Sequence, residues 1–180
     1  FSSIIQSFKD VEKLSYAEDI EIICALFELD KISMNTAKTL IKNFSDFKIY
    51  NQMMSRDVNF RQSDLSSIFN YPNPQKYIKR IFNKGDQSVV GKIKKEKPIL
   101  HYATHNILSY SQPIFNALGS NALFLDIRRH PAYMIKQLVI ANFESLIGDV
   151  RNWTIHYESK KTAIPYYVRN WEDKFHKLNN

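Results

Sequence analysis

Apolar side chains in the first half of the chain recur every three to four residues, which predicts helices. Residues 2–14 are expected to form the first of them. A second helix is expected to follow Ser15, because Ser15 and Glu18 have the spacing of a capping box, in which side chains bond the free backbone N–H groups of a helix start. The residues expected to face the core from this second helix are Ile20, Ile23, Cys24, Leu26 and Phe27.

The remaining elements of this half are also predicted to be helical. They are a helix over 35–44 with Ala37, Leu40, Ile41 and Phe44 inward, a short piece capped by Ser63 or Asp64 and ending near Tyr71, a helix from Pro74 to about Asn83, and a loop over 85–91.

The second half changes to short apolar runs, which predict buried strands over 98–103, 122–127 and 153–157. The segments between and after them are predicted to be helices: one from Ser109 or Ser111 to Gly119, one from Pro131 to about Leu146, and a last one over 165–178. Strands that alternate with helices indicate a parallel sheet with crossover helices. We therefore expect a single α/β domain over 1–180, mainly helical in 1–96, with its α/β core in 97–180.

Composition narrows the class of protein. The chain has 180 residues, of which 44% are hydrophobic, so it can bury a core and wholesale disorder is excluded. Its single cysteine, Cys24, excludes an intrachain disulfide and a metal site built on cysteines, and no metal is expected. A reducing, cytoplasmic location follows as an expectation. No run approaches the ~20 apolar residues of a membrane span.

Positive charge is concentrated in one segment. The net charge is +7, and residues 76–97 hold eight lysines or arginines against two acidic residues. Such a cluster attracts phosphate, sulfate, nucleic acid or an anionic glycan, or else it is a solvated surface.

Polar residues follow two of the predicted strands, where ligands of parallel sheets bind. Arg128, Arg129 and His130 come after the second strand and just before a helix, whose free N–H groups and adjacent guanidinium groups suit an anion. The alternative is that one arginine pairs with Asp126 or Asp149.

His105 follows the first of these strands, between Thr104 and Asn106. An imidazole of ordinary pKa near 6.5 at this place is suited to accept a proton from an alcohol. A structural histidine is the alternative reading.

These two segments resemble the central part of the sulfotransferase family. In that family a strand ends in Thr-His, as at Thr104-His105, and a later strand ends in Arg-x-Pro, as at Arg129-His130-Pro131. The resemblance covers about residues 97–144. It implies a fold related to nucleotide kinases, with 3′-phosphoadenosine 5′-phosphosulfate as sulfuryl donor. It also implies a hydroxyl-bearing acceptor, either a glycan or a small molecule, with His105 as catalytic base and Arg129 on the donor's 3′-phosphate.

Three departures from the family pattern qualify what the resemblance implies. The family has a serine eight residues after its arginine, where this chain has Gln137, an amide that also donates to phosphate. Arg128 is expected to assist electrostatically or to pair structurally. The family's glycine-containing phosphosulfate loop is not found before the first helix, and its later donor-binding segment has no match. Since the chain also begins with Phe1, we expect a piece of a longer enzyme that is inactive alone, or else a chain that has lost activity.

Two other functions stay open. A basic helical module would bind nucleic acid or another polyanion through residues 76–97, with salt-sensitive affinity that does not depend on His105. A relative of the P-loop kinases would share the topology, but it gives the Thr-His pair no role. Under the sulfotransferase reading, no nucleic-acid partner is expected.

Overall fold

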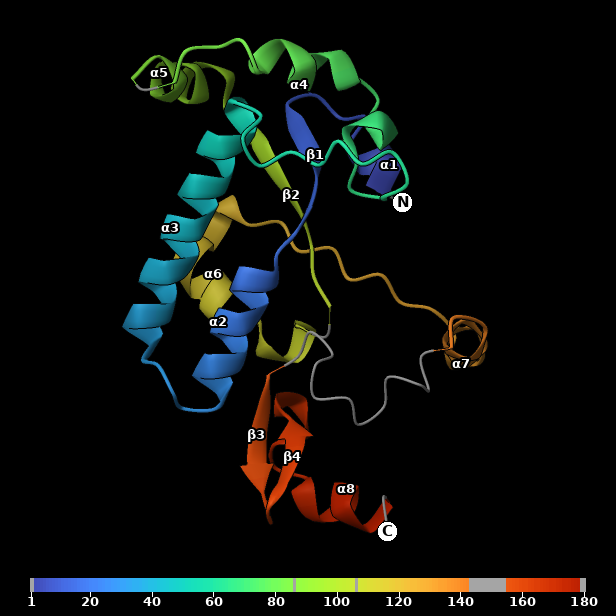
Figure 1. The fold of residues 1–180 in the computed structure, drawn as a ribbon. Coiled ribbons are helices and arrows are strands. Elements are labelled where there is room, and N and C mark those ends of the chain that lie inside the picture. The colour runs from blue at the N-terminus through green and yellow to red at the C-terminus, as the bar shows by residue number, and fades with distance from the viewer. Residues whose placement is uncertain (1, 86, 106, 143–154, 179–180) are drawn as a thin grey trace.

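The computed structural model describes residues 2–85, 87–105, 107–142 and 155–178, which form a mixed α/β structure (Figure 1). In chain order the elements are α1 (Ser2–Ile5), β1 (Val11–Tyr16), α2 (Glu18–Glu28), α3 (Met34–Met53), η1 (Ile68–Asn70), α4 (Pro74–Arg80), α5 (Gln87–Glu96), β2 (Ile99–Ala103), η2 (Leu108–Tyr110), α6 (Gln112–Leu118), η3 (Gly119–Asn121), α7 (Pro131–Ile140), β3 (His156–Ser159), β4 (Thr162–Pro165), η5 (Tyr166–Val168) and α8 (Glu172–Leu178).

A small parallel sheet of β1 and β2 lies directly below α4 and α5, in the upper part of the molecule as Figure 1 shows it. The two strands pair from Val11 and Ile99 to Tyr16 and Ala103. The prediction of a mixed α/β fold with a parallel sheet is confirmed at this coarse level. The sheet's second strand was expected, since β2 lies within residues 98–103, but that strand is only half-buried and Ile99 is exposed.

The helix predicted over 2–14 is wrong. Helix α1 ends at Ile5, and Asp10 has a φ of 63°, a left-handed conformation that ends any helix and that non-glycine residues adopt at a cost. The spacing of Val11 and Leu14 also fits a strand that is buried on both faces, as β1 is. Residues 11–16 form a strand and not a helix because they pair with β2, which is distant in the sequence.

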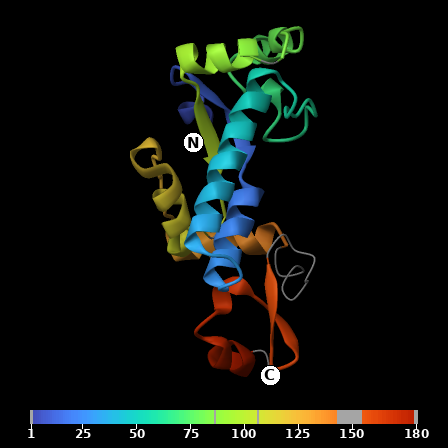
Figure 2. The same cartoon turned by 90° about the vertical axis from the view of Figure 1, so that its left-hand side faces the viewer.

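The main core lies where α2, α3 and α6 pack together beside the sheet (Figure 2). Its buried residues include Ile20, Ile23, Cys24, Ala37, Ile41, Ile107, Ile114 and Ala117, with Leu40 and Phe27 partly buried against them. These core assignments for α2 and α3 are confirmed except at Leu26, which is half-buried and not part of this core, and at Phe44, which is exposed. Helix α3 runs on past the core to Met53.

Two predicted boundaries among the helices are wrong. Ser15 does not cap α2: it lies in β1, where its hydroxyl accepts a hydrogen bond of 2.6 Å from the Gln52 amide, and α2 starts without a side-chain cap. Residues 87–91 belong to α5, not to a loop. Val89 and Ile93, one turn apart, pack on Met53, and this burial outweighs the low helix propensity of Gly91.

Local signals placed two other helices correctly. Pro74 occupies the first turn of α4, with Asn73 as its cap, although α4 ends earlier than expected. The prediction that Ser63 or Asp64 caps a piece ending near Tyr71 is wrong, because only the short η1 forms there and Ser67 caps it. Helix α6 follows Ser111 and ends at Gly119, whose φ of 54° suits glycine.

The strand predicted over 122–127 is wrong. This segment has no regular secondary structure, and Leu123, Leu125 and Ile127 are exposed. No described strand pairs with it, because β2 bonds only to β1. Phe124 of this segment packs against the main core, and the centroid of its ring lies 5.8 Å from that of Phe115 on α6. It leads to α7, which Figure 1 shows standing to one side.

The C-terminal part differs from expectation in topology. Helix α7 starts at Pro131 as predicted but ends at Ile140, since Ala141 is its C-cap and Asn142 has a φ of 55°. The rest of its predicted continuation, beyond 142, lies outside the described residues. The third predicted strand corresponds to β3, but β3 pairs antiparallel with β4 in a separate hairpin, and Trp153 and Thr154 are outside the described residues. The helix expected over 165–178 is divided into η5 and α8. The three-stranded parallel sheet is therefore not formed.

Candidate functional site

The carboxyl ends of β1 and β2 meet at one edge of the sheet, beside the start of α2. Tyr16 is in register with Ala103, and the backbone N–H of Ala17 donates to the Ala103 carbonyl at 3.1 Å. This pairing brings the residues that follow β2, including His105, next to the residues that follow β1. Parallel sheets bind ligands at the carboxyl ends of their strands, so side chains at this edge are placed to contact a ligand.

His105 is held at this edge by two neighbours. Its ring stacks on that of Tyr16, with centroids 5.8 Å apart and planes at 10°. Its backbone N–H donates to Oε1 of Glu21, and its Nδ1 lies 3.3 Å from the same oxygen. The side chain remains 63% exposed, and no partner for Nε2 is found in the described part of the chain. The ring is thus positioned on one side and open to solvent on the other.

Glu21 is the functional candidate that the sequence did not reveal. Burial is the main influence on its carboxyl group and raises its pKa, while the contact with His105 acts in the opposite direction. A carboxylate against Nδ1 favours the tautomer that carries its proton there, which leaves Nε2 free to accept one, and it stabilises the imidazolium that forms. Its place in the first turn of α2, just after β1, is the one sequence feature that points to Glu21 as a site residue. The contact with His105 itself spans 84 residues and leaves no local pattern.

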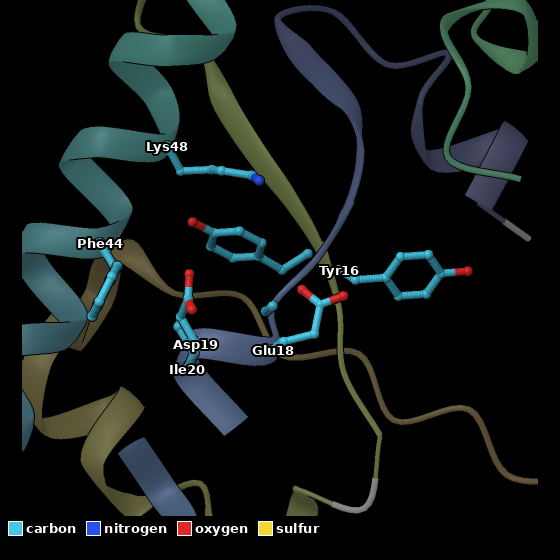
Figure 3. Close-up of a pocket in the computed structure, with 8 residues that line it drawn as sticks. Tyr16, Glu18, Asp19, Ile20, Phe44 and Lys48 are labelled. Atoms are coloured by element: carbon cyan, nitrogen blue, oxygen red, sulfur yellow. The ribbon is translucent and has the colours of Figure 1, made fainter. Parts of the chain in front are cut away.

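A small cavity of about 40 Å³ lies next to this edge (Figure 3). Asp19 and Lys48 border it from α2 and α3, and its other lining residues are Tyr16, Ala17, Glu18, Ile20, Phe44 and Tyr102. Lys48 is paired with Asp57 at 2.5 Å. The space suits a few water molecules or one small substituent, and it is far too small for a nucleotide.

The structure brings Arg129 and Gln137, the two residues that the family resemblance assigns to the donor's 3′-phosphate, into contact. Nη1 of Arg129 donates to Oε1 of Gln137, and both residues are exposed. His130 between them caps α7, because its Nδ1 accepts from the Ala132 N–H at 3.2 Å. This cap fixes where α7 begins and so sets Gln137 two turns along it.

Arg128 behaves differently from Arg129. Its Nε lies 2.5 Å from Oδ2 of Asp126, which is the charge pairing considered as the alternative for this arginine cluster. The other carboxylate considered, Asp149, is outside the described residues, as is Asn106. Within the described ranges, no hydrogen bond or ion pair joins the Arg129–Gln137 pair to His105 and Glu21.

No family model, curated protein or solved structure matches this chain. Among the residues that the structure describes, no group of three or more His, Cys, Asp or Glu side chains is placed to hold a metal ion. In the same residues, no helix has the length and apolar character to cross a bilayer.

Proposed function

We propose that this chain is part of a sulfotransferase that moves a sulfuryl group from 3′-phosphoadenosine 5′-phosphosulfate to a hydroxyl. The observation that carries the proposal is the arrangement of His105 at the carboxyl end of β2. Its Nδ1 lies against a partly buried carboxylate, its ring is supported by Tyr16, and its other face is open.

This arrangement suits the removal of a proton from an alcohol. The donor supplies an activated sulfuryl group. The acceptor's hydroxyl oxygen forms its bond to sulfur as the bond between sulfur and the donor's phosphate oxygen breaks, and adenosine 3′,5′-bisphosphate leaves. Nε2 of His105 accepts the proton of that hydroxyl. Glu21 stabilises the positive charge that then develops on the ring. Tyr16 limits rotation of the ring, so the nitrogen is held in place before the acceptor arrives.

Arg129 and Gln137 are suited to hold a phosphate of the nucleotide. A guanidinium group offers a planar fork of donors that matches phosphate oxygens, and Gln137 adds an amide N–H₂ beside it. Arg128 is already engaged by Asp126, so we assign it a smaller share of the binding. His105 follows β2 and Arg129 precedes α7, and the segment 122–130, which is exposed except at Ala122 and Phe124, connects α6 to α7.

The binding-module alternative leaves the His105–Glu21 contact without a purpose, which is why we rank it second. The test is a calorimetric titration of the chain with adenosine 3′,5′-bisphosphate. Replacing Arg129 by alanine removes charge-assisted hydrogen bonds and should weaken binding by roughly 1.5–3 kcal/mol. Arg128→Ala is the matched control and should cost less, because Asp126 competes for that guanidinium. Equal affinities of wild type and Arg129→Ala would remove Arg129 from the site.

A further inference from the structure

The basic segment 76–97 lies at the end of the molecule opposite the candidate site. Helices α4 and α5 form a layer over the amino-terminal ends of β1 and β2, and both views show them at the same end (Figures 1 and 2). His105 lies at the opposite, carboxyl-terminal edge of the same strands. Strands of five and six residues separate the amino-terminal edge of the sheet from this carboxyl-terminal edge by roughly 15–20 Å.

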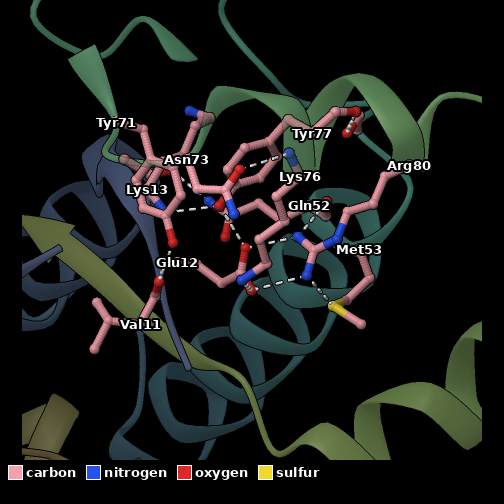
Figure 4. Close-up of polar contacts among 12 residues, drawn as sticks. Val11, Glu12, Lys13, Gln52, Met53, Tyr71, Asn73, Lys76, Tyr77 and Arg80 are labelled. Carbon is pink, nitrogen blue, oxygen red and sulfur yellow. Dashed lines mark hydrogen bonds and ion pairs between the residues drawn. The ribbon is translucent and has the colours of Figure 1, made fainter. Parts of the chain in front are cut away.

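A buried ion cluster fixes the inner side of α4 to the sheet (Figure 4). Glu12 of β1 is fully buried and accepts from both terminal nitrogens of Arg80, at 2.7 and 3.0 Å. Lys76 donates to the same carboxylate at 3.0 Å, and the Tyr77 hydroxyl donates to it as well. Lys76 and Arg80 thus have a structural use, and α4 is held rigidly with its other side outward.

The other cations of this segment have no acidic partner in the described part of the chain. They are Lys79, Lys84, Lys92, Lys94, Lys95 and Lys97, all exposed except the half-buried Lys92. Helix α5 turns Val89 and Ile93 toward Met53 and Met54, so its lysines lie on the remaining, solvent-facing sides. The charge here is therefore not used for folding.

Large apolar side chains are exposed among these lysines. Phe82 is 84% exposed, and Ile78 and Ile81 are 41% and 49% exposed. Ile78 and Phe82 are four residues apart, which puts them on one side of α4 and the turn that follows it. In the sequence Lys79 lies between these two residues, and Lys84 follows them. Protruding apolar residues surrounded by lysines are typical of proteins that lie on a membrane surface.

We propose that the outer face of α4 and α5 docks on an anionic membrane surface. Phe82, Ile78 and Ile81 enter the region between headgroups and acyl chains, and the six lysines contact acidic headgroups. The unpaired cations are all lysines, which act as hydrated point charges, and the apolar group is mainly aliphatic. A nucleic-acid site would instead favour free arginine forks and aromatic stacking platforms. Docked in this way, the chain holds the His105 edge away from the lipid.

Vesicle co-sedimentation of the whole chain tests this proposal. We expect binding to vesicles of roughly a quarter phosphatidylserine in phosphatidylcholine and none to phosphatidylcholine alone, with affinity falling as salt rises. Lys79→Gln with Lys84→Gln should weaken binding about tenfold or more. Phe82→Ser should weaken it by a similar factor, and Phe82→Trp should restore it and give a blue-shifted emission on vesicles.

Matched variants separate this surface from general charge. Lys31→Gln with Lys42→Gln removes two exposed lysines elsewhere, and Phe47→Ser removes another exposed phenylalanine, of α3. Both should bind vesicles as wild type does. All these side chains are at the surface, so circular dichroism should show an unchanged fold. Equal loss in the controls, binding to neutral vesicles, binding to neither vesicle, or binding to nucleic acid in place of lipid would each overturn the proposal.

Discussion

Removing Arg80 tests the claim that a buried ion cluster joins α4 to the sheet. The Arg80 side chain is 7% exposed and Glu12 is not exposed at all. Arg80→Ala leaves the carboxylate in the interior without its two closest charged donors, at 2.7 and 3.0 Å. Breaking a buried pair in this way costs about 3–5 kcal/mol. That is a large part of the roughly 5–15 kcal/mol that stabilises a typical domain.

Urea unfolding followed by circular dichroism gives the free energy of unfolding. At slopes of about 1–3 kcal/mol per molar urea, the midpoint should fall by roughly 1–5 M in Arg80→Ala. Lys76→Ala is the control, because the Lys76 side chain is 27% exposed and water can replace its ammonium group, so we expect a loss of no more than about 1 kcal/mol. Glu12→Met combined with Arg80→Met should cost less than the two single changes added together, since neither charge is then left unpaired.

The pH dependence of the same cluster has a definite sign. Burial acts to raise the pKa of Glu12, but the hydrogen bonds and charge of Arg80, with Tyr77 and Lys76, outweigh it and hold that pKa below its usual value near 4.5. The stabilisation is therefore complete above the pKa that Glu12 has in the unfolded chain, and it is lost as the pH falls through the pKa that Glu12 has in the folded protein.

A loss of unfolding free energy under about 1 kcal/mol in Arg80→Ala at pH 7 would refute the reasoning, because the Glu12 carboxylate would then not depend on its partner.

Three further predictions concern other parts of the fold. Burial lowers the pKa of Lys13, so the free energy of unfolding of wild type should rise relative to that of Lys13→Met as the pH rises from 7 toward 10. Urea unfolding measures this difference, and a difference that stays constant with pH would contradict the prediction. Gly119→Ala should lose about 1–3 kcal/mol, because its φ of 54° strains any other residue, whereas Gly91→Ala within α5 should gain up to about 1 kcal/mol, with thermal melts as the measurement. Because α7 exposes apolar side chains on every side, the chain should bind the dye ANS, and Ile135→Asp with Val139→Asp should reduce its fluorescence without lowering the melting temperature.

Elements with strong local signals could be predicted from the sequence. Helix α6 follows Ser111 and ends at a glycine with positive φ, and α7 begins at Pro131, because caps and prolines act within one turn. Arg129 and Gln137 were named together only through the family resemblance, and their hydrogen bond is a finding of the structure.

Elements that depend on distant partners could not be predicted. Strand β1 carries apolar residues at helical spacing, and only its register with β2 makes it a strand. The segment 122–127 has the composition of a buried strand but no described strand beside it, so it remains extended and exposed. Glu21 joins His105 across 84 residues, and a pattern within one stretch of sequence does not show such a contact.

The central claim is that His105 is the base for sulfuryl transfer, and the turnover of a His105→Ala variant tests it most directly. The measurement belongs in an active form of the enzyme that includes a phosphosulfate-binding loop, with a hydroxyl acceptor and radiolabelled donor. Proton transfer by a positioned side chain contributes about 10²–10⁴ in rate. We predict that kcat falls within that range while the affinity for adenosine 3′,5′-bisphosphate stays nearly unchanged, and that Glu21→Gln causes a smaller fall in kcat. A His105→Ala enzyme that keeps most of its turnover would contradict the account and assign the proton to another residue.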